Sequence, residues 1–338
     1  MRKYLKIKKI FFPYDTEEGN ISNKQLLKKT DKYLIHKQNN KIHKGHIIAK
    51  FKKYKILDCK ICKFIHCTPF PKQKEINLFY KKKFYEQKRK KNYFSLQKKQ
   101  IIWWNRIFKE RLDKFKKILG KTGSILDIGC GPGFFLKYAK KRGWHANGID
   151  SSESAVTYAK KNLKLKDVER IHYQDLVFKK KNLYDVIYSN GVLEHVEDPL
   201  NFIKISHKLL KKKGLLFLSV ANDFNIFQFL SMKNISKPWW ILPPEHINYF
   251  RTNDLKKIFK KNKFQIISIS SSFPIEIFLL MGQNYIKNKN IGKYAHLQRV
   301  KFEKHFEDNK FTMFKQKIYE QFSSLGLGRA IEIIVQKK

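Results

Sequence analysis

The sequence has little arginine, few acidic residues and no long apolar run. Only nine of its 73 basic residues are arginines, and 28 acidic residues leave a formal net charge of +45. Specific reading of nucleic-acid bases relies on arginine, so this composition argues against a base-reading protein, although lysines bind phosphates without specificity. Abundant Asn, Ile, Phe and Tyr are typical of adenine- and thymine-rich codons, which explains the lysines. The densest basic stretch, residues 81–100, is either a solvated amphipathic helix or a clamp for an anionic substrate.

A membrane span and a secretory signal are also missing from the sequence. No apolar run approaches the roughly 18 residues of a span, and the opening residues have no apolar signal core. The longest candidate, residues 273–282, is too short and contains Glu276. Four unevenly spaced cysteines fit a reducing compartment, with no structural disulfides. We therefore expect a cytoplasmic protein.

The length of 338 residues is enough for two modest domains, each with its own core. We place the first at residues 1–95, an N-terminal segment with a Cys-x-x-C turn and a basic helix, and the second at 96–338. Apolar residues recur at helical spacing from 92 to 119, which predicts a helix leading into the second domain, at about 96–119. An insertion is expected at about 273–327.

The most informative motif is an apolar strand that breaks into three glycines and then becomes helical. It reads Leu126-Asp127-Ile128-Gly129-Cys130-Gly131-Pro132-Gly133. Glycine permits the positive φ of a tight strand-to-helix turn and lets a ligand approach the backbone, while the next helix presents free N–H groups. The motif therefore predicts a nucleotide pocket. A dinucleotide enzyme is the main alternative, but its fingerprint needs a small residue where Phe134 stands.

Two further apolar segments end in a carboxylate. Residues 146–150 end in Asp150, twenty-three residues after Asp127. A carboxylate at the end of a second strand can accept hydrogen bonds from both ribose hydroxyls of a nucleotide. Residues 171–175 look like a third strand that ends in Asp175, a partner for the amine of adenine.

The strands continue along the chain and bring more polar ends to the same place. A fourth strand begins at Tyr184 and runs into a polar turn at Asn190, and a fifth covers residues 215–220. Residues 264–270 and 330–335 alternate like two last strands. The polar ends of the first four strands converge on one crevice, where open α/β sheets bind their ligands.

In order and spacing, these elements resemble the class I S-adenosylmethionine-dependent methyltransferases over approximately residues 120–270. The matching elements are the glycine run, Asp150, Asp175 and the segment Val192-Leu193-Glu194-His195-Val196. The resemblance implies a Rossmann-like α/β fold with a seven-stranded, mostly parallel sheet, beside a smaller N-terminal α+β segment. It also implies that the glycines lie under the methionine part of the cofactor, that Asp150 holds the ribose and that Asp175 contacts adenine. The implied cofactor residues are Asp127, Gly129, Cys130, Gly131, Gly133, Asp150, Ser151, Asp175, Leu176 and Asn190.

The resemblance implies an enzyme that aligns a sulfonium methyl group with its acceptor and excludes water. We expect transfer to an oxygen or carbon of a small-molecule or glycan-linked acceptor; the alternative, which the charge suggests, is an RNA- or tRNA-modifying methyltransferase. A hydroxyl acceptor would need a base, and His195 and His246 are the candidates because both lie in loops expected near the methyl group. In the competing interpretation His195 caps or packs its helix and His246 only bonds backbone.

A metal site is the last candidate feature. Cys59 and Cys62 are three residues apart, so a tight turn can present both thiolates to one zinc ion. The following segment resembles an N-terminal knuckle of some bacterial methyltransferases, but those carry two such pairs and this chain has one. Since structural zinc takes four ligands, either other side chains complete the site or the turn has lost its metal. The available ligands are His36, His43, His46, His66 and Cys67.

Overall fold

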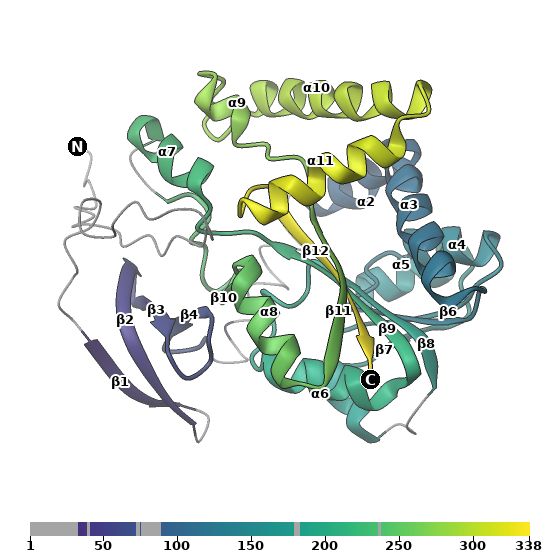
Figure 1. The fold of residues 1–338 in the computed structure, drawn as a ribbon, viewed down its shortest axis with the longest axis horizontal. Coiled ribbons are helices and arrows are strands. Elements are labelled where there is room, and N and C mark those ends of the chain that lie inside the picture. Colours follow the sequence, from purple (N-terminus) through teal and green to yellow (C-terminus); the bar gives the residue numbers. More distant parts are fainter. Residues whose placement is uncertain (1–32, 39–40, 72–74, 76–88, 179–182, 236–237) are drawn as a thin grey trace. The chain divides into compact units, whose positions relative to one another are not determined.

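A computed structural model describes residues 33–38, 41–71, 75, 89–178, 183–235 and 238–338. The chain divides into two compact units (Figure 1). The first, here named the Rossmann unit, comprises the described residues of Gln73–Ser219, Phe259–Ser268 and Ile333–Lys338. The second, named the meander unit, comprises the described residues of Met1–Lys72, Val220–Ile258 and Ile269–Glu332. The chain crosses between the units several times, whereas the sequence prediction placed a single boundary after residue 95.

The Rossmann unit is built on a seven-stranded sheet, and most of its strands lie near the residues predicted from the sequence. Its strands are β5 (Ser124–Ile128), β6 (His145–Asp150), β7 (Val168–Arg170), β8 (Tyr184–Asn190), β9 (Leu210–Ala221), β11 (Phe264–Ser271) and β12 (Ala330–Lys337). Their order is β11-β12-β9-β8-β5-β6-β7, and the neighbours from β9 to β7 are parallel. The predicted seven-stranded, mostly parallel α/β fold is confirmed. Within this sheet the first strand along the chain is β5. The next two strands, β6 and β7, lie on one side of it, and the later strands lie on the other side. The ligand crevice of such a sheet opens where the order reverses, beside the carboxyl end of β5.

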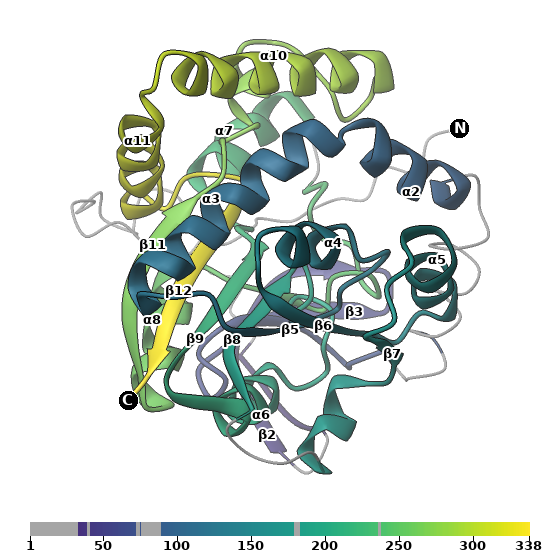
Figure 2. The same ribbon diagram turned by 90° about the vertical axis from the view of Figure 1, so that its right-hand side faces the viewer.

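Helices cover both faces of the parallel strands in the Rossmann unit. They are α2 (Arg89–Lys99), α3 (Ile101–Leu119), α4 (Phe134–Lys141), α5 (Glu153–Leu163) and α6 (Pro199–Leu209). Helices α3, α4 and α5 lie on one face and α6 on the other (Figure 2). On the first face Phe135 stacks on Tyr188 with ring centroids 3.8 Å apart, and Tyr188 stacks on Phe217 at 4.9 Å. This aromatic stack joins α4 to β8 and β9 beside the ends of the strands that bear the site.

Two local predictions in this unit are wrong. The single helix predicted over 92–119 is two helices, because Gln100, with φ −98° and ψ 14°, separates α2 from α3. The third strand ends at Arg170, and its predicted last residues form a 3₁₀ helix, η2 (Tyr173–Phe178). Tyr173 and Leu176 are both buried, and their three-residue spacing matches the 3₁₀ repeat rather than the two-residue repeat of a strand.

The meander unit contains a five-stranded sheet with the order β1-β2-β3-β4-β10. Its strands are β1 (Tyr33–Gln38), β2 (Lys41–Phe51), β3 (Tyr54–Cys59), β4 (Ile65–Thr68) and β10 (Asn248–Tyr249), all paired antiparallel. The last strand comes from a distant part of the sequence, so the N-terminal sheet is completed by the segment after β9. Its core includes Ile56, Ile65, Trp240 and Tyr249.

Five further helices of the described residues follow β9. They are α7 (Ile226–Ile235), α8 (Thr252–Lys261), α9 (Ile277–Leu280), α10 (Lys289–Asp308) and α11 (Thr312–Ser324). The predicted insertion at 273–327 therefore consists of α9, α10 and α11, which pack around Phe273, Phe278, Ala295 and Tyr319 in the meander unit.

Within the described residues, no helix is long and apolar enough to cross a membrane. Residues 81–88 of the basic stretch at 81–100 and the opening residues 1–32 lie outside the described residues.

Candidate functional site

The predicted glycine run forms the turn between β5 and α4, and its three glycines all have positive φ. Gly129, Gly131 and Gly133 have φ of 77°, 54° and 83°. A Cβ atom on Gly129 would lie 2.4 Å from Val192 Cγ2, whereas a Cβ on Gly131 would meet nothing within 4 Å. Gly129 is therefore required by packing as well as by its backbone conformation, and Gly131 leaves its side of the turn open to a ligand.

Asp150 ends β6 and holds the glycine turn directly. Its Oδ2 accepts the Gly131 N–H at 2.8 Å, and its Oδ1 accepts the Ser152 N–H at 2.8 Å. Burial raises the pKa of this carboxyl, and the two backbone N–H groups partly offset that rise by stabilising the charged form. A carboxylate offers about four acceptor sites, so each oxygen retains a lone pair for a ribose hydroxyl.

Asp127 is the second-to-last residue of β5, a buried carboxyl near a buried arginine. Its pKa lies well above the usual value because of burial and then of the nearby Asp150 charge, while the positive charge of Arg111 opposes the rise. Arg111 comes from α3 and donates hydrogen bonds to Tyr188 Oη and, at 3.2 Å, to Asn190 Oδ1. Asn190 ends β8, so a single side chain links the helix before the sheet to the polar ends of β5 and β8.

The raised pKa of Asp127 predicts that its charge costs stability. Because folding favours the protonated form, the penalty grows as pH rises from the unfolded value of about 4 toward the folded one. We expect Asp127→Asn at pH 7 to leave Tm level or raise it by about 2–4 °C, the effect of about 1 kcal/mol in a domain of this size. The difference should vanish toward pH 4. The same change should weaken binding of the positively charged cofactor by about tenfold, because the cofactor's charge favours the ionised form of Asp127, which asparagine lacks.

Calorimetry of folding and titration with S-adenosylmethionine check this prediction. Asp113→Asn is the matched control, because Asp113 is an exposed acid that pairs with Lys109 and Arg142. Exposed pairs contribute little, so neither Tm nor affinity should change measurably there. A destabilised Asp127→Asn variant with unchanged affinity would contradict the assignment.

The other predicted cofactor residues lie on the same side of the Rossmann unit or face its core. Ser151 follows β6 and is exposed, and Asp175 is exposed on η2 next to the buried Leu176. The Cys130 side chain is 8% exposed and belongs to the hydrophobic core, and its thiol donates to Gly131 O at 3.8 Å. Contacts of these four residues with the cofactor stay predictions.

The donors and acceptors of this turn suit the predicted cofactor. Asp150 supplies acceptors for ribose hydroxyls, Gly131 offers bare backbone, and Asp127 is a carboxyl whose ionised form a positively charged ligand would favour. Helix α4 begins directly after Gly133, and N–H groups at a helix start favour a carboxylate. The set lacks a phosphate-binding small residue at Phe134, which the structure buries at 7% exposure.

The meander unit contains a second polar cluster, which surrounds His246. His246 Nδ1 lies 3.6 Å from Asp223 Oδ2, too far for a hydrogen bond but close enough for a charge interaction. Arg329 Nη1 donates to Asp223 Oδ1 at 3.1 Å, and Gln228 Nε2 donates to the same oxygen at 3.3 Å. Burial would raise the pKa of Asp223, but the neighbouring His246 and Arg329 outweigh it and hold the pKa below its usual value.

Glu276 shares this cluster and behaves in the opposite way. Its carboxylate is fully buried, lies 3.9 Å from the Arg329 guanidinium and has a pKa raised by burial, which the Arg329 charge only partly offsets. One arginine thus stands between two buried acids, and Asp223 is the one that keeps its negative charge beside His246.

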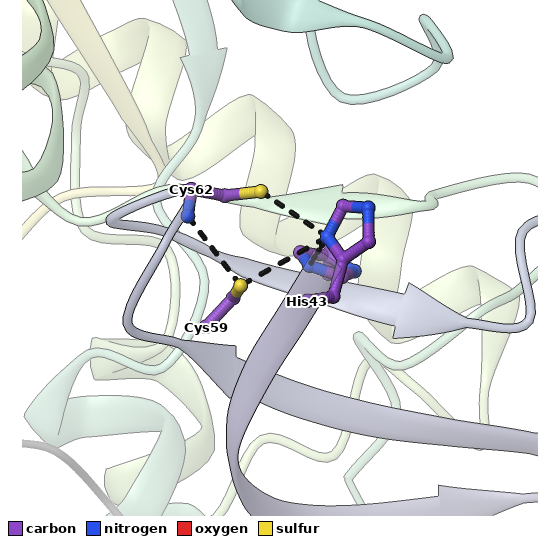
Figure 3. Close-up of side chains that lie close together, drawn as sticks. His43, Cys59 and Cys62 are labelled. Carbon is purple, nitrogen blue, oxygen red and sulfur yellow. Dashed lines mark hydrogen bonds between the residues drawn. The ribbon is translucent and has the colours of Figure 1, made fainter. Parts of the chain in front are cut away.

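His195, the other predicted base, lies in the turn after β8, in the Rossmann unit. It is half-buried, and its backbone N–H donates to Val192 O at 2.9 Å. It does not cap the next helix, because the α6 cap is Asp198, whose side chain accepts the Asn201 N–H at 3.1 Å. Cys59 and Cys62, the predicted metal ligands, lie at the end of β3 and in the turn after it, and both side chains point toward His43 (Figure 3).

Sequence reasoning missed Arg111, Asp223 and Arg329. Asp223 could have been found, because it is a polar residue two positions after β9, much as Asp150 is the last residue of β6. Arg111 reads as an exposed helical position among lysines, and Arg329 is separated from Asp223 by 106 residues, so nothing local indicates either role.

Three comparisons with known proteins bear on the site. A sequence model of the methyltransferase domain family matches residues 101–269, half of the chain. A ubiquinone biosynthesis O-methyltransferase from Pelagibacter ubique is 34% identical over 192 residues, 53% of this chain and 75% of that protein. One of the same name from Nitrosomonas europaea is 32% identical over 135 residues, 36% of this chain and 57% of that protein. A crystal structure of a SAM dependent methyltransferase from Archaeoglobus fulgidus has a TM-score of 0.46 at 17% identity, covering 72% of this chain and 99% of that one.

Proposed function

Because this chain belongs to the S-adenosylmethionine-dependent methyltransferases, we propose that it methylates a hydroxyl oxygen of a small-molecule acceptor. The predicted enzyme class and cofactor are confirmed by the family. The names of the relatives, which are O-methyltransferases, support oxygen as the methylated atom. So does the cluster of His246, Asp223 and Arg329 in the meander unit. The matched part of the chain excludes most of the meander unit, so the acceptor itself is not carried over from the relatives.

The observation that carries the proposal is the pair formed by His246 and Asp223. An alcohol or phenol oxygen attacks a methyl group well only when its proton is removed, and histidine is suited to this because it titrates near neutrality. The ionised Asp223 faces Nδ1 of His246 and so favours the proton on that nitrogen. The other ring nitrogen, Nε2, is then the unprotonated one, which is the form that can take the acceptor proton.

The reaction is a displacement in which the residues of this chain position and deprotonate. The bound cofactor supplies a methyl group on a positively charged sulfur, which leaves as a neutral thioether. His246 would take the acceptor proton at Nε2, so that the acceptor oxygen becomes the nucleophile for that methyl group. Asp223 stabilises the imidazolium so formed, and the proton passes from His246 to water. In the Rossmann unit Asp150 and the glycine turn would hold the cofactor.

Incubation of the purified protein with methyl-labelled cofactor tests the proposal and separates it from the RNA alternative. One arm contains a panel of catechols, phenols and sugar alcohols, and the other contains bulk tRNA at physiological salt. We expect label in at least one hydroxyl compound, as a methyl ether by NMR, and none above background in tRNA. Binding to tRNA should fade steeply with salt, because lysine contacts with phosphates release counterions. Label in tRNA alone, or on carbon alone, would overturn the proposal.

A further inference from the structure

Four potential metal ligands come together in the meander unit, and methyl transfer uses none of them. They are His43 on β2, Cys59 at the end of β3, Cys62 in the next turn and His66 on β4. One ligand atom of each lies within 4.8 Å of every other. Figure 3 shows both cysteine side chains directed at the His43 ring. Two histidines thus stand where a second cysteine pair would complete a four-ligand site.

The distances between these atoms match a tetrahedral zinc ion. His43 Nδ1 is 3.2 Å from His66 Nε2, 3.3 Å from Cys62 Sγ and 3.9 Å from Cys59 Sγ. Zinc bonds nitrogen at about 2.05 Å and thiolate sulfur at about 2.3 Å, so tetrahedral geometry separates two nitrogens by about 3.3 Å and nitrogen from sulfur by about 3.6 Å. The observed nitrogen–nitrogen distance of 3.2 Å is close to the first value, and the two nitrogen–sulfur distances, 3.3 Å and 3.9 Å, lie on either side of the second.

Hydrogen bonds to backbone groups set the protonation of two of the ligands. His66 Nδ1 lies 2.9 Å from Cys67 O, so this nitrogen carries the proton and donates it to the carbonyl. The lone pair is then on His66 Nε2, the atom that faces the other ligands; such an outer hydrogen bond is usual for metal-binding histidines. The Cys62 N–H points to Cys59 Sγ at 3.4 Å, which favours a thiolate there.

Three of the four ligands are closed from solvent, and Cys62 is half-buried. His66 is fully buried, and Cys59 and His43 are 2% and 4% exposed. Phe70 stacks on His66 with centroids 5.0 Å apart and meets His43 edge-on at 5.6 Å. Four protein ligands without an open position are typical of structural zinc, whereas catalytic zinc keeps one position for water.

We propose that His43, Cys59, Cys62 and His66 bind one Zn²⁺ as a structural site that joins β2, β3 and β4 and positions the strand next to His246. Two thiolates and two imidazoles are a ligand set that favours zinc. Binding takes up one Zn²⁺ and releases the two thiol protons of Cys59 and Cys62, and no electron is transferred. The site needs no activity from the rest of the chain, so it stands independently of the proposed methyl transfer.

The link to His246 runs through β-strand pairing inside the same unit. His66 is paired with Asn248, and Ile65 with Tyr249, so β4 carries β10 along its edge. The Cys67 N–H donates to Ile247 O at 2.9 Å, directly after His246. Fixing His66 on a metal therefore fixes the backbone that bears the proposed base.

Metal analysis is the first test. Protein produced with zinc in the medium and purified without chelator should contain about one zinc per chain. Exchange with Co²⁺ should give the visible absorption of a tetrahedral cobalt site with thiolate-to-metal charge transfer. Wild-type protein with less than about a tenth of an equivalent of zinc that also binds no cobalt would overturn the proposal. A disulfide between Cys59 and Cys62, detected by mass spectrometry in protein kept reduced, would overturn it too.

Matched variants assign the ligands. Cys62→Ser and His43→Ala should each lose zinc and the cobalt spectrum. Cys67→Ala and His46→Ala change the same residue types on β4 and β2, outside the cluster, and should keep about one equivalent. Equal zinc in all four variants, or loss in the two controls alone, would contradict the assigned ligands. Because a ligand variant could fail to fold, the cobalt spectrum of the wild type remains the deciding measurement.

Hydrogen exchange tests the positioning role on the wild-type protein with and without zinc. Removing zinc with a chelator should speed exchange at least tenfold for amides of residues 65–68 and 247–249. Adding zinc back should restore protection. Amides of β5 and β6 and the affinity for S-adenosylhomocysteine should stay unchanged, since both belong to the Rossmann unit. Unaltered exchange at β4 and β10 after complete metal removal would rule out the positioning role.

Discussion

Replacing Asp150 by alanine is expected to weaken binding of S-adenosylhomocysteine about 100-fold. The carboxylate oxygens are placed by the N–H groups of Gly131 and Ser152 and keep lone pairs for two ribose hydroxyls. Hydrogen bonds to a charged group contribute about 1.5–3 kcal/mol each, and each 1.4 kcal/mol is a factor of ten in affinity. Isothermal titration of wild type and variant measures the change directly.

A second variant separates ligand contacts from support of the glycine turn. Asp150→Asn keeps one carbonyl oxygen but loses the charge, so its affinity should fall about tenfold, between wild type and alanine. The control is Asp167→Asn, which removes an exposed carboxylate paired with Lys140 and should bind like wild type. Wild-type affinity in Asp150→Ala, with circular dichroism showing a folded protein, would remove Asp150 from the cofactor site.

Replacing His246 by alanine is expected to lower kcat for methylation of a hydroxyl acceptor by about 10²–10³-fold, the range for loss of a general base. Affinity for S-adenosylhomocysteine should not change, because the cofactor residues lie in the Rossmann unit. In the wild type kcat/KM should rise with pH as the histidine loses its proton, and this rise should disappear in the variant. Because the pKa of Asp223 is lowered, that acid is already charged throughout the neutral range and contributes no second pH dependence to the profile.

His195→Ala is the informative comparison, since His195 is the second predicted base. If His195→Ala loses the pH-dependent rise and His246→Ala keeps it, the roles are reversed and the interpretation of the Asp223 cluster is wrong. His145→Ala removes an exposed ring at the start of β6 and should leave kcat unchanged. Rate measurements from pH 5.5 to 9 at saturating cofactor distinguish these cases.

The cofactor side of this protein was largely predictable because its parts are local in sequence. The positive φ angles of Gly129, Gly131 and Gly133 follow from a strand that must turn at once into a helix. Parallel strands bring their carboxyl ends to one edge, so Asp127 and Asp150 could be placed together from the sequence pattern. The error at Asp175 arose because a short segment with buried residues three apart, Tyr173 and Leu176, was read as a strand.

The cluster around His246 and the proposed zinc site were less predictable from the sequence than the cofactor residues were. The candidate ligands included His43 and His66 but equally His36 and His46, and only the antiparallel register selects among them. In β2 the side chains of His43 and His46 differ by an odd number of positions, so they face opposite sides of the strand, and the structure turns His43 inward. Asp223 and Arg329 are 106 residues apart, so their contact depends on where the fold places the segment before the last strand.

The sequence by itself determined the family, the cofactor and the approximate positions of the central strands along the chain, because those depend on backbone requirements that short motifs state directly. The tertiary structure decided which side chains meet across long separations. It brought Arg111 to Asn190, Arg329 to Asp223, and two histidines to the Cys59–Cys62 turn. The physical reason is that a strand's register and a helix's facing side are set by the packing of whole elements, which no local pattern encodes.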